Sequence, residues 1–119
     1  MVNMKRNDFI QEIFDKVSKH LLKQNKKAVN DEGSYRLHYK KLRCSVGCLI
    51  PDRDYIPQME NLIFAHRISY FEEAGYLDHE LSFINELQVI HDCYEPNQWS
   101  KKLKILAKIN NLKFKGIKT

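Results

Sequence analysis

The spacing of the apolar residues is the feature that most constrains the fold of this chain. Over residues 8–25 apolar side chains recur every three or four positions, and the same spacing returns over residues 79–92 and 96–109. Such spacing predicts amphipathic helices that turn one face toward a core. A further helix is expected between Pro57 and Gly75, because proline suits the first helical turn and glycine suits the residue that follows the last turn. Pro96 opens the final helix in the same way, and Trp99 is expected in the core.

Residues 34–46 follow a period of two instead. Tyr35, Leu37 and Tyr39 alternate with polar residues, which predicts two short strands with Lys40 and Lys41 at the turn between them. Residues 42–50 also fit the spacing of a short buried helix, so both alternatives stay open. The predicted fold class is α+β and mainly α, with about four helices packed against one short β-hairpin.

The chain has 119 residues, which predicts a single compact domain over residues 1–119. A chain of this length buries about two-thirds of the surface that it exposes when unfolded, so it supports a core without metal or disulfide. No apolar run is long enough to cross a bilayer, so no membrane partner is expected. An odd number of cysteines and a start without an apolar signal region predict a cytoplasmic protein with reduced thiols.

Charge is segregated along the chain. Residues 1–48 hold 11 Lys and Arg against 5 Asp and Glu, residues 49–98 hold 2 against 10, and residues 99–119 hold 7 against none. We expect the basic segments to lie beside the acidic middle, within one molecule or between two, which leaves a homo-oligomer open. The alternatives are a merely dipolar surface and a basic face that meets an anionic partner: an acidic host protein, a nucleotide or a nucleic acid.

The predicted hairpin is the first candidate binding site, because cations and aromatic rings alternate there. Arginine can pair with phosphate through two hydrogen bonds, and tyrosine offers a ring face for stacking. The competing interpretation is a solvated edge strand that lysines protect from pairing. The candidate ligand-binding residues are Tyr35, Arg36, Tyr39, Lys40, Lys41 and Arg43.

The last predicted helix offers a second candidate surface. Lys101, Lys104 and Lys108 fall within one narrow arc of that helix. Such an arc fits a regulator that binds nucleic acid with an affinity that falls steeply with salt. A solvated helix face is the alternative.

A thiol or zinc site is the third alternative. Cys44 and Cys48 have a C-x3-C spacing, and His91 could add a ligand. The competing interpretation is that both cysteines are small buried apolar residues. The four glycines are too scattered for a phosphate-binding loop. We therefore assign no catalytic residue and expect no cofactor and no metal.

Residues 42–52 read L-R-C-S-V-G-C-L-I-P-D, and Tyr55 and the P-Q-M-E of residues 57–60 follow. Together with L-Q-V-I-H-D at residues 87–92 and Trp99, they resemble a small family of uncharacterised phage and prophage proteins with a C-x-V-G-C-L-I-P-D motif. The resemblance implies a compact protein of phage type that acts in the host cytoplasm, and it assigns no catalytic residue. The leading hypothesis is a non-enzymatic binding protein that counters a host defence system by binding a host protein or sequestering a nucleotide signal.

Overall fold

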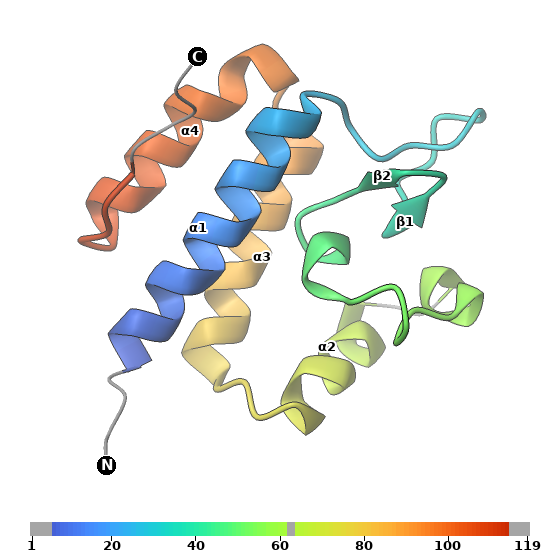
Figure 1. The fold of residues 1–119 in the computed structure, drawn as a ribbon, viewed down its shortest axis with the longest axis horizontal. Coiled ribbons are helices and arrows are strands. Elements are labelled where there is room, and N and C mark those ends of the chain that lie inside the picture. The colour runs from blue at the N-terminus through green and yellow to red at the C-terminus, as the bar shows by residue number, and fades with distance from the viewer. Residues whose placement is uncertain (1–5, 62–63, 115–119) are drawn as a thin grey trace.

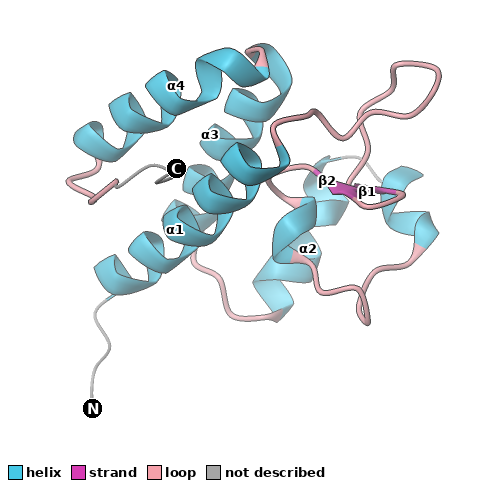
Figure 2. Ribbon diagram, turned by 45° about the horizontal axis from the view of Figure 1, so that its top comes forward, coloured by secondary structure: helices cyan, strands magenta, loops and turns pink. Residues whose placement is uncertain are grey.

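The computed structural model describes residues 6–61 and 64–114, and helices predominate in this part of the chain. Helices α1 (Arg6–Gln24), α3 (Asp78–Cys93) and α4 (Pro96–Ile109) pack against one another and form one half of the molecule (Figure 1). The other half contains the antiparallel strands β1 (His38–Tyr39) and β2 (Leu42–Arg43), two 3-10 helices, η1 (Gly47–Leu49) and η2 (Pro57–Asn61), and helix α2 (Phe64–Glu73) (Figure 2). The fold is α+β and mainly α, as predicted. None of the helices in the described part could span a membrane.

The core is centred between α1, α3 and α4, where the apolar stripes of the three helices meet, and it extends to Leu37, Val46, Leu49, Ile50 and Phe71. Trp99 is fully buried, as the spacing predicted, and its indole nitrogen donates a hydrogen bond to the carbonyl of Tyr94 at 3.0 Å. Burial of large apolar side chains is the main stabilising contribution in such a bundle. The buried apolar residues of the three helices are Ile10, Ile13, Phe14, Val17, Leu21, Leu81, Phe83, Ile84, Leu87, Ile90, Trp99, Leu103, Leu106 and Ala107.

The helix boundaries follow local chemistry. Pro96 occupies the first turn of α4, as predicted. Gly75 follows α2 with a φ of 98°, a left-handed conformation that glycine adopts without steric cost. At the start of α3 the buried Glu80 accepts a hydrogen bond from the backbone N–H of Leu77 at 2.7 Å, which satisfies a donor that the helix itself leaves unpaired.

The hairpin forms where the period of two predicted it, but its strands are shorter. His38 pairs with Arg43 and Tyr39 with Leu42, so Lys40 and Lys41 make the turn. Each alternative for residues 42–50 holds in part, because strand β2 covers Leu42–Arg43 and the 3-10 helix η1 covers Gly47–Leu49.

The helix predicted between Pro57 and Gly75 is confirmed only in part. Residues Pro57–Asn61 form the tighter 3-10 helix η2, and α2 begins only at Phe64. Glu60 lies in η2 and accepts hydrogen bonds from the hairpin backbone. These tertiary contacts decide the path of the segment, where the local pattern alone favoured a longer helix.

Residues 45–49, which contain η1, connect the hairpin half to the helical half through hydrogen bonds to α3. Ser45 donates a hydrogen bond to the carbonyl of Leu87 on α3 at 2.8 Å, and the side chain of Gln88 accepts one from the backbone of Val46 at 2.8 Å. Gly47 lies so close to the backbone of Leu37 that a Cβ at this position would be 2.0 Å from the Leu37 carbonyl oxygen. Only glycine allows this approach, and it sets the position of the hairpin relative to α1 and α3.

Candidate functional site

The carboxylate of Glu60, on η2, holds the start of the hairpin in place. This carboxylate accepts hydrogen bonds from the backbone N–H groups of Leu37 (2.8 Å) and His38 (2.9 Å) and from the Tyr55 hydroxyl (2.7 Å), and Arg36 pairs with it at 3.2 Å. Burial disfavours its ionisation, but these hydrogen bonds and the Arg36 charge outweigh burial and lower the pKa of Glu60. Glu60 therefore stays ionised and organises the first strand.

Arg43, on the second strand, is also engaged within the protein. Its guanidinium pairs with Asp52 at 3.2 Å and donates to the carbonyls of Lys40 (2.7 Å) and Leu42 (2.8 Å). The segregated charge predicted such pairing, since Arg36 and Arg43 belong to the basic first segment and their carboxylate partners to the acidic middle. Both arginines of the candidate hairpin site thus stabilise the hairpin itself.

The tyrosines of the hairpin region have partners too. Tyr35 donates a hydrogen bond to the carbonyl of Asp92 at 2.8 Å. The ring of Tyr39 has the Arg36 guanidinium at 5.9 Å and the Lys40 ammonium at 5.3 Å from its centre. Both cations lie within cation–π distance of the Tyr39 ring. Among the six candidate residues, Lys40 and Lys41 are exposed cations for which the described part of the chain shows no ion pair.

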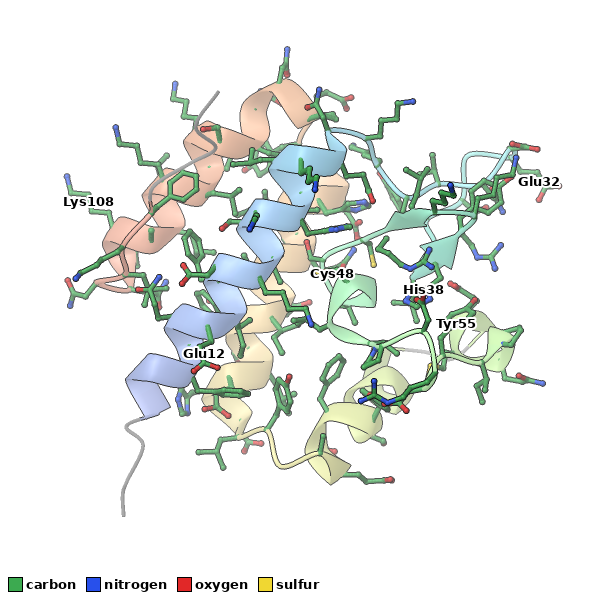
Figure 3. The ribbon with its side chains drawn as sticks, in the orientation of Figure 1. Glu12, Glu32, His38, Cys48, Tyr55 and Lys108 are labelled. Atoms are coloured by element: carbon green, nitrogen blue, oxygen red, sulfur yellow. The ribbon has the colours of Figure 1, made fainter. Side chains whose placement is uncertain are left out.

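His38 belongs to this cluster, and sequence reasoning missed its role. It is buried, and its ring stacks on Tyr55 with ring centres 4.1 Å apart. Figure 3 shows the two side chains next to each other. Its Nε2 lies 2.8 Å from the carbonyl of Gly47, so this nitrogen carries the proton and donates it. Gly47, Tyr55 and Glu60, all from the motif of residues 42–60, meet around the hairpin. Their closeness in the sequence was the signal that could have predicted this cluster.

His91 is placed in the core rather than at a site. Its Nε2 accepts a hydrogen bond from the backbone N–H of Ala28 at 2.9 Å, which leaves the ring proton on Nδ1, 2.6 Å from a carboxylate oxygen of Asp92. The ring stacks on Trp99 with centres 5.5 Å apart. Nε2 therefore joins the loop after α1 to α3, and Nδ1 is bonded to the neighbouring Asp92 on α3 itself. Neither nitrogen can bind a metal without breaking one of these bonds.

The two clustered cysteines are also structural. Cys44 accepts a hydrogen bond from the backbone N–H of Gly47, and Cys48 donates one to the carbonyl of Ser45, each at 3.2 Å. Burial raises the pKa of each thiol to about 12, so neither is a thiolate near neutral pH. Over residues 6–61 and 64–114 no cluster of three metal-ligating side chains is found. The described residues thus give no support to the thiol or zinc alternative built on Cys44, Cys48 and His91.

The lysines of α4 have a different environment. Lys101, Lys104 and Lys108 are exposed on the outer face of the helix, and Lys108 points away from α1 in Figure 3. Lys102, by contrast, lies over the ring of Tyr94 at 4.4 Å from its centre. The arc predicted from the sequence is therefore a continuous basic helix face.

Comparison with known proteins found no matching family model, no similar curated protein and no similar solved structure.

Proposed function

We propose that this protein is a non-enzymatic binding protein that recognises an anionic partner through the outer face of α4. The observation that supports the proposal is the row of Lys101, Lys104 and Lys108, which are exposed and form no ion pair with any described residue. At spacings of three and four residues they lie on one side of the helix and span roughly 10 Å. A row of this length suits an extended anionic surface better than a single small anion.

The hairpin is the weaker of the two basic surfaces. Arg36 and Arg43 already have carboxylate partners, so an incoming anion would have to compete with Glu60 and Asp52. A competing anion gains little where the charge is already neutralised. The proposal therefore rests on the lysines of α4, and the exposed lysines of the hairpin turn serve as its control.

The surroundings of His38, His91, Cys44 and Cys48 favour a structural role for these four residues, which supports a binding function. His91 uses both ring nitrogens in hydrogen bonds, and His38 uses Nε2. The raised pKa values of Cys44 and Cys48 keep these thiols protonated. Nucleophilic catalysis by a cysteine needs its thiolate, which these two residues do not form near neutral pH.

The resemblance of residues 42–60 to a phage-type motif supports a more specific proposal. A small phage protein without an active site can act by occupying the surface of a host component, including one that defends the cell. On this proposal the basic face of α4 meets an acidic surface in the host cytoplasm.

The test uses two anionic probes, poly-L-glutamate and a 20-base-pair DNA duplex, with fluorescence anisotropy at 50 and 300 mM salt. We expect binding to at least one probe at 50 mM salt that weakens steeply at 300 mM, because released counterions drive such association. The triple variant Lys101→Gln, Lys104→Gln, Lys108→Gln is expected to lose most of the binding. For DNA its log–log salt slope should be smaller by about 2 to 3.

The matched control is the double variant Lys40→Gln, Lys41→Gln, which removes exposed lysines from the hairpin turn instead. It is expected to bind nearly as the unaltered chain does. The proposal fails if neither probe binds at 50 mM salt, or if the hairpin variant loses more affinity than the α4 variant.

A further inference from the structure

The basic face of α4 also carries two exposed isoleucines. Ile105 is 46% exposed and Ile109 is 72% exposed, and they lie among Lys101, Lys104 and Lys108 at spacings of three and four residues. The opposite face of the same helix is occupied by core residues such as Trp99. Helix α4 therefore uses one side for the core and presents a second amphipathic surface outward.

We infer that the partner is a protein that presents an acidic amphipathic helix, which lies along this face of α4. This inference rests on the proposed function and names the class of partner. Glutamates or aspartates three and four residues apart would meet the lysines, and apolar side chains four residues apart would cover Ile105 and Ile109. Burying the isoleucines adds a favourable contribution that an all-polar partner cannot supply.

Charge complementarity requires the acidic groups to come from outside this helix. Residues Pro96–Ile109 contain four lysines and no acidic residue, and Lys102 alone is held over a neighbouring ring. An uncompensated basic helix face with apolar residues among its cations is typical of a surface that binds an acidic amphipathic partner.

A second copy of this chain fits the face less well. The outer face of α3 offers Asp78 and Glu86 as exposed acidic residues, with Ser82 and Asn85 between them, and Val89 as its exposed apolar residue. Asp78 and Glu86 are eight positions apart, so they cannot pair with Lys101, Lys104 and Lys108 together. The acidic helix is therefore assigned to another protein.

A nucleic acid and a lipid surface also fit less well. Phosphate oxygens give the two isoleucines nothing apolar to contact, so binding to nucleic acid would use the lysines alone. An anionic membrane would call for a broad apolar face, whereas here the described residues of α4 expose two large apolar side chains.

The experiment compares two synthetic peptides of identical composition with the full chain, by isothermal titration calorimetry and anisotropy. One peptide is a helix with leucines along one stripe and glutamates beside it, and the other has the same residues in scrambled order. We expect the amphipathic peptide to bind about tenfold or more tightly than the scrambled one, because only it can cover Ile105 and Ile109. The 20-base-pair duplex and vesicles of phosphatidylglycerol with phosphatidylcholine are run beside them.

Variants separate the apolar from the charged contribution. The double variant Ile105→Asn, Ile109→Asn changes exposed residues, so it should fold normally, and we expect it to bind both peptides equally while keeping the salt dependence. Val89→Asn, which changes an exposed apolar residue of α3, is the matched control and should leave the preference intact.

Three results would overturn the inference while leaving the proposed function standing. These are equal binding of the two peptides by the unaltered chain, tighter binding to the duplex or the vesicles, and a preference that survives the double isoleucine variant. Self-association that is lost in the isoleucine variant, seen by sedimentation, would assign the face to a second copy instead. If neither peptide nor the duplex binds at 50 mM salt, the proposed function fails as well.

Discussion

Substitution of Gly47 by alanine tests whether the close approach of η1 to the hairpin holds the two halves of the molecule together. A Cβ on residue 47 would lie 2.0 Å from the carbonyl oxygen of Leu37 and 2.7 Å from its carbon. Since such contacts are not seen below 3.0 Å, one of the two backbones must move by about 1 Å.

The expected cost follows from the bonds made at this point. Forced overpacking typically costs 1–3 kcal/mol. The same movement strains the hydrogen bond from His38 to the carbonyl of Gly47 (2.8 Å) and the one from the N–H of Cys44 to the carbonyl of Leu37 (3.3 Å), each contributing about 1 kcal/mol. The free energy of unfolding should therefore fall by about 3–5 kcal/mol, which lowers Tm by roughly 12–20 °C for a chain of this size.

Urea denaturation and differential scanning calorimetry measure this change. Gly33→Ala is the matched control, because a Cβ on Gly33 meets nothing within 4 Å and only its φ of 83° makes alanine unfavourable. That control should lose about 1 kcal/mol. If Gly47→Ala loses no more stability than Gly33→Ala, the close approach does not hold the hairpin and the reasoning is refuted.

Two further predictions concern titration and reactivity. The pKa of Glu60 is lowered in the folded chain, so its stabilising contribution is complete above the ordinary pKa of 4.5 and is lost as pH falls through the folded pKa. Glu60→Gln should therefore flatten the acid side of a curve of unfolding free energy against pH, measured by urea denaturation. An unchanged acid side would contradict this. Ellman's reagent should modify the exposed Cys93 quickly in the native chain and reach Cys44 and Cys48 only on unfolding, because burial keeps these two thiols protonated. Rapid reaction of three thiols in the native chain would contradict the burial of Cys44 and Cys48.

The helices of the core could be predicted because their signals are local. Pro96 and Gly75 mark helix ends through their own backbone preferences, and the apolar spacing that placed Trp99 in the core depends only on helix geometry. The period of two likewise located the hairpin and the two lysines at its turn.

The candidate site could be predicted only in part. The lysines of α4 share a face because of their spacing, so the sequence already placed them together. The fate of Arg36 and Arg43 depends on Glu60 and Asp52, which lie 24 and 9 residues further along the chain, and no local pattern specifies such a pairing. The same holds for His91, whose partner Ala28 is 63 residues away.

The order of residues therefore determined the helical periods, the hairpin turn and the uneven distribution of charge, since each depends on neighbours within a few positions. Only the tertiary structure decided which charges are neutralised. Ion pairs and buried hydrogen bonds form between groups that folding brings within about 3 Å. Their formation removed the hairpin arginines and His91 from the set of available groups. Folding left the basic and apolar outer face of α4 exposed, and the proposals of a binding function and of an acidic helical partner rest on that face.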